Sequence, residues 1–409
     1  MNFRKAIPAF VAAILAVSSR AEVKLGNEVL STGGFKTLQG KRVGLITNPS
    51  GVNRNLESTI DVLRAAPGVK LVALFGPEHG IYGDVPAGDI VESRTDARTG
   101  LPVHSLYGAT HRPTPEMLKG LDALVYDLQD TGCRSYTYIS TMGVAMEACG
   151  DAGIEFVVLD RPNPLGGDRV EGPMVQEKFR SFVSRWDIPY VYGMTCGELA
   201  QMINGEHWIT NASRLTIVPM KGWKRSMVWR DTGLPWVPTS PHIPHGESPL
   251  FQVATGMLGE VGGVSTGIGY TLPFQCIAAP NLNPHKMAEW LNGYKLPGVR
   301  FKAITYQPYY FIFKDELIGG VQLYFTQPDQ VPLTALNFYV LEALRKTAGR
   351  DLFAEAARTN KSFAMFDKVN GTDATRKALQ AGGSAAEIAA SWRLGEEAFR
   401  KLRRKYLLY

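Results

Sequence analysis

The sequence predicts an α/β protein in which a Rossmann-like, mostly parallel and doubly wound sheet is followed by a second, smaller α+β domain. Two observations favour this fold class. Short apolar runs alternate with helical stretches over the first two thirds of the chain, whereas the last third carries β-like runs first and helices after them. The chain has 409 residues, of which 45% are hydrophobic, so it is long enough to build two domains.

The strands of the first domain are expected in nearly continuous hydrophobic runs, because strands buried on both faces of a parallel sheet carry apolar side chains on both sides. These runs are residues 42–47, 69–75, 121–128, 154–159 and 215–218. Helical spacing occurs in residues 56–65, 138–152, 196–204 and 250–258. Strands and helices in this repeated order predict a parallel sheet.

The smaller domain is expected to begin near residue 281. Its β-like runs are residues 299–305, 309–313 and 321–325, and helices are expected to begin at Leu333, Ala385 and Glu396. We therefore expect residues 22–280 to form the Rossmann-like domain and residues 281–409 the smaller one.

Residues 1–21 are expected to be a secretory signal peptide, because a basic start precedes an apolar stretch and small residues flank a cut near Ala21. Their removal takes away Arg4, Lys5 and Arg20, so the formal net charge of +6 falls to +3. A nearly neutral chain argues against a nucleic-acid partner, and no other apolar run is long enough to span a membrane. We therefore expect a periplasmic or secreted protein.

The usual sequence carriers of cofactor and metal chemistry are missing. No Gly-x-Gly-x-x-Gly follows the first strand, and the chain has no Gly-Lys-Ser/Thr phosphate loop and no Gly-x-Ser-x-Gly elbow. The four cysteines lack Cys-x-x-Cys spacing, so buried free thiols are expected, with one disulfide as the alternative, at Cys133, Cys149, Cys196 and Cys276. We expect no cofactor and no metal.

Polar loops follow four successive predicted strands, at the sheet edge where open α/β proteins place their sites. Glu78 and His79 lie on a turn after the second strand, where partial burial can raise the pKa of a carboxyl group into the range of a general acid. Glu78 is therefore the first candidate for a catalytic acid, with His79 beside it. The alternatives are a Glu78 that caps the next turn with His79 bonded to backbone, or a metal site of His79 with Asp84 or Asp89.

The loops after the first, third and fourth strands carry candidate substrate-binding residues. Carboxylates, guanidinium groups and aromatic rings gather after the third strand, and such a mixture suits carbohydrate, because rings stack on sugar faces while charged groups bind hydroxyls or an acidic substituent. The alternative is an internal Asp–Arg ion pair that pins the loop. After the fourth strand two prolines stiffen the chain, which suits a preorganised site or a plain rigid turn. The candidates are Asn48, Asp127, Gln129, Asp130, Arg134, Tyr138, Asp160, Arg161 and Asn163.

Two features of the later sequence complete the candidates. His242 is expected to face substrate alone, because Pro244 prevents the regular helix that would set it on one face with His245. Aromatic residues in the smaller domain are more typical of a core than of a ligand platform, and no role is assigned to Tyr306, Tyr309, Tyr310, Phe311 and Phe313.

Many motifs occur in a single order along the whole chain. They are Thr47-Asn48-Pro49, Gly76-Pro77-Glu78-His79-Gly80, Asp127-Leu128-Gln129-Asp130, Arg134 with Tyr136-Thr137-Tyr138, Asp160-Arg161-Pro162-Asn163-Pro164, Glu171-Gly172-Pro173, Gly193-Met194-Thr195 with Gly197-Glu198-Leu199, Phe366-Asp367-Lys368 and Tyr406-Leu407-Leu408-Tyr409. With these motifs the chain resembles the exo-β-N-acetylmuramidases of glycoside hydrolase family 171. The resemblance implies a Rossmann-like domain, a smaller second domain, a cleft between them, and release of N-acetylmuramic acid from the non-reducing ends of peptidoglycan fragments.

The resemblance also shows departures. Tyr192 stands where the family has His, and it joins Glu171 among the substrate-binding candidates; His242 stands where the family has Asn. Thr266 and Ile268 replace a Glu and an Arg, and Tyr82 lies where an Arg is usual. An acidic lactyl group is best bound by Arg. We therefore expect glycosidase chemistry to be kept and the lactyl carboxylate to be bound weakly or by Arg134 or Arg161.

The second catalytic group and the mechanism stay open at this stage. Asp130, Asp160, Glu171 and Glu260 are unranked candidates, and assistance by the substrate's own 2-acetamido group is equally open. Retaining and inverting glycosidases differ in the separation of their carboxyl groups, about 5–5.5 Å against about 6.5–9.5 Å. The competing function is a non-catalytic cell-wall sugar-binding protein that keeps the same cleft.

Overall fold

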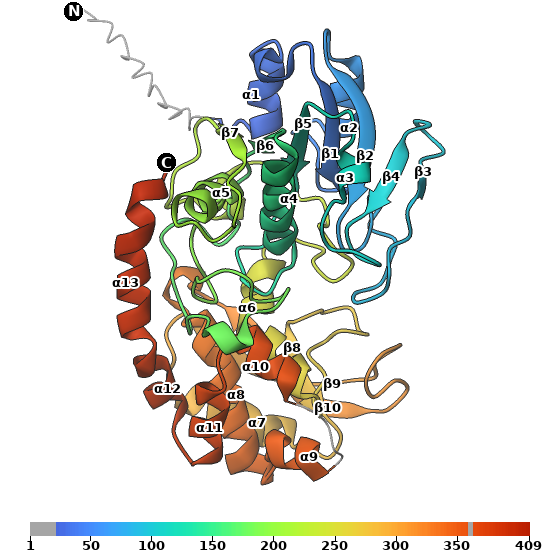
Figure 1. The fold of residues 1–409 in the computed structure, drawn as a ribbon. Coiled ribbons are helices and arrows are strands. Elements are labelled where there is room, and N and C mark those ends of the chain that lie inside the picture. The colour runs from blue at the N-terminus through green and yellow to red at the C-terminus, as the bar shows by residue number, and fades with distance from the viewer. Residues whose placement is uncertain (1–21, 359–362) are drawn as a thin grey trace, which may run out of the picture.

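The computed structural model describes residues 22–358 and 363–409, so the predicted signal peptide lies outside the described residues. Figure 1 shows an α/β lobe above an α+β lobe. The strands are β1 Arg42–Thr47, β2 Lys70–Gly76, β3 Arg94–Thr95, β4 Pro102–Ser105, β5 Ala123–Asp127, β6 Glu155–Leu159, β7 Arg214–Val218, β8 Cys276–Ala279, β9 Val299–Tyr306 and β10 Ile318–Phe325. The helices are α1 Gly26–Thr32, α2 Thr59–Ala65, α3 Pro115–Leu118, α4 Tyr138–Ala152, α5 Cys196–Gly205, α6 Ser248–Val261, α7 Pro284–Gly293, α8 Leu333–Ala348, α9 Leu352–Arg358, α10 Ala364–Asn370, α11 Ala374–Gln380, α12 Ala385–Ser391 and α13 Arg393–Arg403.

The upper lobe is built on a sheet whose order, within the described residues, is β3-β4-β2-β1-β5-β6-β7. All neighbouring pairs are parallel except β3 with β4. Strand β1 has β2 on one side and β5 on the other, so the chain winds away from the centre in both directions. The loops that leave β1, β2 and β5 therefore border a topological switch point, where open α/β sheets bind ligands.

Alternate side chains of the central strands pack into two separate cores. Val43 and Leu45 of β1 face the core under α1 and α2, whereas Ile46 faces the core under α3, α4 and α5. Side chains alternate across a strand, so a run that is apolar at every position is buried on both faces. The Rossmann-like, mostly parallel sheet predicted from such runs is confirmed.

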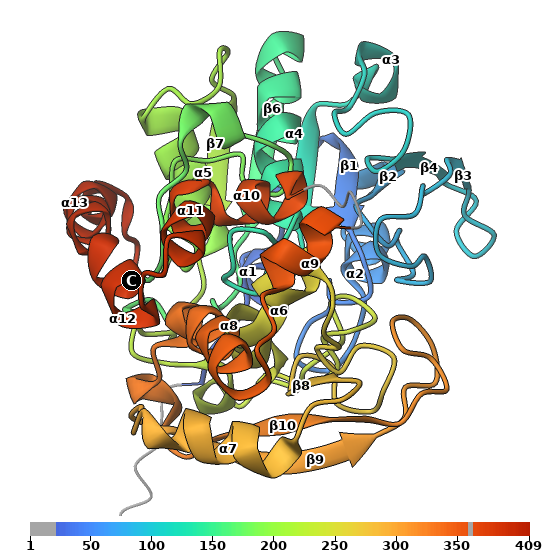
Figure 2. The ribbon, with the colours of Figure 1, turned by 90° about the horizontal axis from the view of Figure 1, so that it is seen from below.

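The lower lobe contains a small antiparallel sheet in the order β8-β10-β9. Helix α7 packs on this sheet, as Figure 2 shows from below, and α8 packs on α6 and α7. Strand β8 and helix α6 precede residue 281, where the sequence suggests the boundary, yet both belong to this lobe by contact. Ala279 pairs with Gly319 of β10, and Val253 and Met257 share a core with Leu336 of α8. The packing therefore divides the chain near the start of α6.

Residues 309–313 do not form the strand expected from their apolar sequence. Strand β9 ends at Tyr306, and β10 starts at Ile318. Between them Phe311 and Phe313 have φ angles of 68° and 58°, which an extended strand cannot contain. This prediction was wrong because a run of aromatic and branched residues favours a strand by its pattern, whereas the backbone here turns.

The end of the described chain returns from the lower lobe to the upper one. Helix α13 runs along the side of both lobes in Figure 1. Its Phe399 is buried in the core of the upper lobe under α4 and α5. The Tyr409 hydroxyl donates to Asp160 Oδ2 at 2.7 Å, just after β6. The two lobes are thus joined by this segment as well as by the chain before α6.

Two smaller expectations concern the cysteines and the membrane. All four cysteines are buried free thiols, as predicted. None of the helices in the described residues is long and apolar enough to cross a membrane.

Candidate active site

A cavity of about 480 Å³ lies between the two lobes. The upper lobe contributes Glu78 and His79, after β2, and Thr137, just before α4. Helix α6 of the lower lobe contributes Glu260. His242 lines the cavity from the long connection before α6. The cavity thus gathers two carboxylates and two imidazoles beside the switch point of the sheet.

The carboxylate of Glu78 is oriented by donors from two different segments. The Thr137 hydroxyl donates to Oε2 at 2.6 Å, and the backbone N–H of Gly88 donates to Oε1 at 3.0 Å. Tyr107 also lines the cavity. The pKa of its hydroxyl is raised well above the ordinary value, mainly by burial and to a lesser extent by the nearby Glu78 carboxylate. Glu78 is therefore a partly buried, held carboxyl group on the wall of a cavity. Its bond to Gly88 also closes the loop, so the predicted capping role and a catalytic role are compatible.

His79 lies in the left-handed region, with φ of 70°, and its ring borders the cavity. Its Nδ1 is 2.8 Å from the carbonyl oxygen of Val85. The backbone contact considered from the sequence is therefore present, and it fixes the ring while the rest of the imidazole borders the cavity. Among the described residues, no group of three His, Cys, Asp or Glu side chains is arranged to hold a metal ion.

His242 is half-buried at the cavity wall. Its Nε2 lies 3.0 Å from the hydroxyl of Tyr310, which comes from the β9–β10 loop. Burial, followed by the proximity of His79, lowers the pKa of His242 below its ordinary value of 6.5. The ring is therefore mainly neutral at pH 7, and it can offer a hydrogen bond without a fixed charge.

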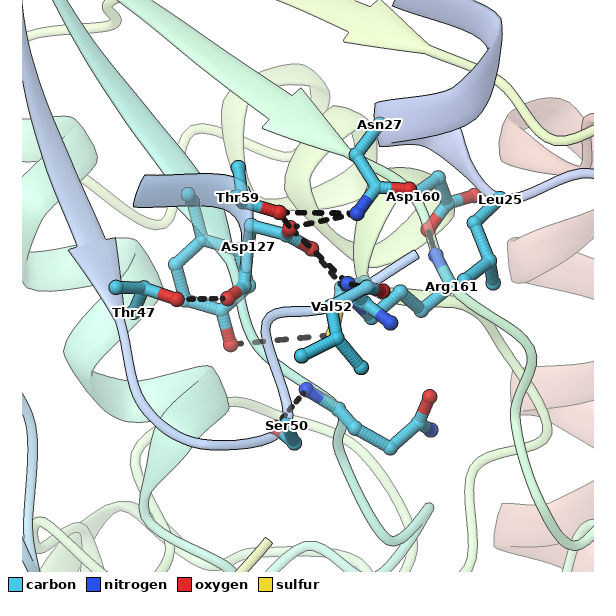
Figure 3. Close-up of polar contacts among 12 residues, drawn as sticks. Leu25, Asn27, Thr47, Ser50, Val52, Thr59, Asp127, Asp160 and Arg161 are labelled. Carbon is cyan, nitrogen blue, oxygen red and sulfur yellow. Dashed lines mark hydrogen bonds and ion pairs between the residues drawn. The ribbon is translucent and has the colours of Figure 1, made fainter. Parts of the chain in front are cut away.

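Most other candidates from the sequence lie beneath the cavity and are occupied by internal contacts. Figure 3 shows the first group, in which Asp127 and Arg161 point toward one another. They form an ion pair that is almost fully buried, with Nη2 of Arg161 3.0 Å from Oδ2 of Asp127. Thr59 and Asn27 donate to the same carboxylate. This is the internal Asp–Arg pair of the alternative hypothesis, although the arginine comes from the next loop.

Asn48 and Tyr138 brace the loops instead of facing the cavity. The Asn48 amide donates to the Tyr138 hydroxyl and to the carbonyl oxygen of Thr239, each at 2.8 Å. Its Oδ1 accepts from the backbone and hydroxyl of Ser50. Gln129 donates in the same manner to the backbone carbonyl oxygen of Pro162, at 2.8 Å. The amide groups of Asn48 and Gln129 therefore donate their hydrogen bonds to neighbouring loops.

Asp130 is buried, and its pKa is raised by that burial to about 6. Its Oδ2 accepts from the backbone of Gly132 and from the hydroxyl of Tyr192. Its Oδ1 has no hydrogen-bond partner. Neither Asp130 nor Tyr192 borders the cavity, so both side chains lie behind the site.

The next two candidates hold the start of α5 and the turn after β6. Asp160 accepts from Thr195 at 2.7 Å and from Tyr409 at 2.7 Å, and burial raises its pKa to about 6. Asn163 donates to the carbonyl oxygen of Met194 at 2.9 Å. This turn is therefore stiff because its side chains are tied to neighbouring segments.

Arg134 and Glu171 join the lobes. The fully buried Arg134 guanidinium donates to the carbonyl oxygens of Pro173, Ile188 and Val369, and burial lowers its pKa to about 10. Glu171 accepts from the backbone N–H of Thr334, at the start of α8. Arg134 therefore stabilises loops from both lobes.

The contact of Arg134 or Arg161 with a lactyl carboxylate stays a prediction, and the structure shows where the two side chains lie. Both guanidinium groups are bound to other groups of the protein, and neither residue lines the cavity. Of the positions expected from the sequence to depart from the family pattern, His242, Thr266 and Ile268 line the cavity, whereas Tyr82 and Tyr192 do not. Among the described residues, the cavity lining contains neither lysine nor arginine.

Sequence reasoning missed Tyr107 and Gln252, which both line the cavity. Tyr107 follows β4, a four-residue strand that is too short for a hydrophobic run to reveal. Gln252 lies on α6, on the same face of the helix as Gly256 and Glu260. The spacing of four between these residues could have predicted that they share a face. The helix was predicted from its apolar residues, whereas the face that lines the cavity was not predicted.

Comparison with known proteins places these features in a family. The family model described as exo-beta-N-acetylmuramidase NamZ, N-terminal, matches residues 43–247, and the corresponding C-terminal model matches residues 252–409. The chain belongs to the exo-β-N-acetylmuramidase NamZ family. The gap between the two matches falls at the start of α6, in agreement with the packing division of the lobes.

Three relatives match this chain over nearly its whole length. A peptidoglycan beta-N-acetylmuramidase NamZ of Bacillus subtilis strain 168 is 44% identical over 96% of this chain and 92% of its own length. A crystal structure of a DUF1343 family protein of Bacteroides fragilis superposes with a TM-score of 0.88 and 48% identity, covering 95% of this chain and all of the other. A second DUF1343 protein of that organism gives a TM-score of 0.75 and 29% identity, covering 95% of this chain and 99% of the other.

Proposed function

We propose that this member of the NamZ family is an exo-acting glycosidase that releases N-acetylmuramic acid from the non-reducing ends of peptidoglycan fragments. The observation that carries the proposal is the held carboxyl group of Glu78 in the cavity between the lobes, with a second carboxylate, Glu260, on the opposite lobe. Most glycosidases use two carboxyl groups that flank the bond they cleave, and this cavity contains two.

In this mechanism Glu78 protonates the glycosidic oxygen as the bond to the leaving sugar breaks. The Thr137 and Gly88 donors hold the carboxyl group in one orientation while it gives up its proton. Positive charge develops on the remaining muramyl ring, and a carboxylate on the opposite side stabilises that charge or attacks the ring directly. A water molecule then adds to the anomeric carbon and gives a proton to a carboxylate of the site, which releases N-acetylmuramic acid.

Glu260 is the proposed second group. Of the four candidates, Asp130, Asp160 and Glu171 are engaged with backbone and side-chain donors away from the cavity. Glu260 alone among these four lines the cavity. Its place on a helix of the lower lobe means that the relative position of the two lobes sets the separation of the two carboxyl groups.

Recognition of the muramyl group is proposed to use neutral donors. Because the described lining contains no lysine or arginine, the lactyl carboxylate is met by the imidazole of His242 and by hydroxyls such as those of Tyr107, Ser240 and Thr266. Hydrogen bonds from neutral groups bind a carboxylate less strongly than an Arg fork does. We therefore expect only a modest preference for muramides over the matching glucosaminides.

Hydrolysis of chromogenic substrates tests the proposal. Purified protein is incubated with 4-nitrophenyl β-N-acetylmuramide and with the corresponding β-N-acetylglucosaminide, in wild-type form and as Glu78→Gln. We expect release from the muramide, and a loss of at least about a hundredfold in kcat for Glu78→Gln on a natural disaccharide with a poor leaving group.

Glu92→Gln is the matched control, because Glu92 is an exposed glutamate in the loop after Glu78. It should retain wild-type turnover. Binding of muramide without hydrolysis by the wild type would instead favour the sugar-binding alternative. Full activity in a folded Glu78→Gln variant would move the acid role to another residue.

Glu260→Gln tests the second carboxylate separately. We expect a loss of kcat on the disaccharide with little change in thermal stability, since Glu260 lies on the cavity wall. Unchanged turnover would assign the second role to the 2-acetamido group of the substrate.

We also propose that the protein is exported to the periplasm or beyond, where peptidoglycan fragments are accessible. The support is the basic, apolar and small-residue order of residues 1–21. Mass spectrometry of protein recovered from native cells should find a chain that starts close to residue 22. An intact chain in the cytoplasm that still begins at Met1 would contradict export.

A further inference from the structure

Three consecutive aromatic side chains on the β9–β10 loop, residues 307–317, are exposed and have no role in the proposed chemistry. Tyr309, Tyr310 and Phe311 are 63%, 50% and 69% exposed. Aromatic rings usually contribute to cores, so a contiguous exposed set marks a binding surface. Figure 1 shows the loop, in orange, projecting beyond the small sheet.

The exposed rings rest on a stack of aromatic side chains that reaches into the lower lobe. The ring of Tyr309 lies 5.8 Å from that of Tyr270, between centroids. Tyr270 in turn stacks on the buried Tyr306 at 4.5 Å, with an angle of 24° between the rings. The Tyr306 hydroxyl donates to Ser265 at 2.9 Å. This end of the loop is therefore supported by packed side chains.

The backbone of the loop is also fixed. The N–H of Tyr309 donates to the carbonyl oxygen of Gly269 at 2.7 Å. A Cβ atom on Gly269 would lie 2.0 Å from the carbonyl oxygen of Tyr310, so the two backbones meet closely. Phe311, with φ of 68°, occupies the left-handed region that a bulky side chain adopts at a cost. A strained residue held in a supported loop keeps its ring in a defined place.

The loop borders the cavity that contains Glu78. Phe311 and Ile312 line that cavity, although Phe311 is largely exposed, so its ring lies at the rim. The Tyr310 hydroxyl contacts His242 on the cavity wall. The aromatic surface is thus continuous with the site and lies at its opening.

We propose that Tyr309, Tyr310 and Phe311 form a platform that binds the leaving-group sugar, the N-acetylglucosamine ring on the far side of the scissile bond. An exo-acting enzyme places the terminal sugar inside its cavity, so the next ring emerges at the rim. The faces of a pyranose ring present C–H groups that pack against aromatic rings. This inference rests on the proposed function, because the position of the leaving group depends on which sugar enters the cavity.

The test compares substrates that share the muramyl group and differ in the leaving group. One is the β-linked N-acetylmuramyl-N-acetylglucosamine disaccharide, and the other is methyl β-N-acetylmuramide. Phe311→Ala should lower the ratio of kcat/KM between disaccharide and methyl glycoside about tenfold, mainly through KM. Leu317→Ala is the matched control: this side chain is 74% exposed on the same loop and does not line the cavity, so its ratio should equal that of the wild type.

A binding measurement separates this inference from the catalytic proposal. Calorimetric titration of Glu78→Gln with the disaccharide reports affinity without turnover, and adding Phe311→Ala should weaken it about tenfold. Wild-type protein that cleaves neither substrate would contradict the proposed function, while the titration would still decide the platform. An unchanged ratio together with an unchanged affinity for the disaccharide would overturn the assignment to the leaving-group sugar.

Discussion

The polar residues beneath the sheet edge and those on the cavity wall differ in where their hydrogen bonds go. Asp127, Arg161 and Arg134 are buried and bound to protein groups. Glu78 and His242 are also held by neighbours, yet they border open volume. In this fold a polar residue at the carboxyl end of a strand indicates the region of a site. Only a polar residue that also borders the cavity is placed to contact substrate.

The buried set has its own effect on the site. Its members join loops after β1, β5 and β6 to one another, and they fix the wall from which Glu78 and Thr137 project. Removal of a buried charge should therefore cost stability first, whereas removal of a wall group should cost turnover. The following predictions separate these two outcomes.

Arg161→Ala should produce the largest change in stability. It leaves the fully buried Asp127 carboxylate without its ion-pair partner, at a cost of about 3–5 kcal/mol in the free energy of unfolding. Urea unfolding measures this loss. Arg98→Ala is the control, because its pair with Asp61 is exposed and should contribute less than about 1 kcal/mol. An Arg161→Ala protein of normal stability that no longer binds muramide would place Arg161 in the substrate site.

Thr137→Val should lower kcat by about ten- to hundredfold with a small change in stability. The hydroxyl orients the Glu78 carboxyl group, and it makes no capping bond to α4. Steady-state kinetics on the disaccharide measures the effect. Thr141→Val is the matched control, since the Thr141 hydroxyl on the same helix is buried without a hydrogen-bond partner. Equal kinetics in both variants would remove the positioning role of Thr137.

Asp130→Asn should give the smallest effect, and one that depends on pH. Burial raises the folded-state pKa of Asp130 from 3.8 to about 6, so between these values the folded protein holds a proton that the unfolded chain has released. Its contribution to stability is complete below pH 4 and is lost as the pH rises through 6. The amide does not titrate, so the Tm of the variant minus that of the wild type should increase from pH 4 to pH 7.

Thermal melts across this pH range measure that difference. A difference independent of pH would show that Asp130 titrates alike in the folded and unfolded states. A variant that gained stability at pH 4 instead would reverse the sign and contradict the assigned direction of the pKa shift.

The sequence predicted the parallel sheet because the strands buried on both faces carry unbroken non-polar runs, as in residues 43–46 of β1 and 123–126 of β5. It also selected Glu78, His79 and His242, all of which reach the cavity. It could not separate them from the buried candidates, because that distinction depends on partners far along the chain. Arg134 meets Val369, which is 235 residues away, and no local pattern records such a pairing.

The aromatic loop shows the opposite limit. Its residues read as a strand because hydrophobic and aromatic side chains dominate residues 309–313, and pattern alone does not reveal a left-handed φ at Phe311. Tyr107 was missed since β4 offers only four residues of sequence before it. Hydrophobic periodicity therefore did not predict which irregular segments border the cavity.

The return of α13 to the upper lobe has a consequence for the order of events during synthesis. Residues 42–218, which contain the whole large sheet, leave the ribosome long before Phe399, Arg403 and Tyr409. Until those late residues arrive, the Phe399 site under α4 and α5 is empty, the carbonyl oxygens of Gly167 and Gly193 lack the Arg403 donor, and Asp160 lacks the Tyr409 hydroxyl. The lobe made first is therefore completed by the segment made last, and a nascent chain halted near residue 390 should expose an incomplete core to proteases.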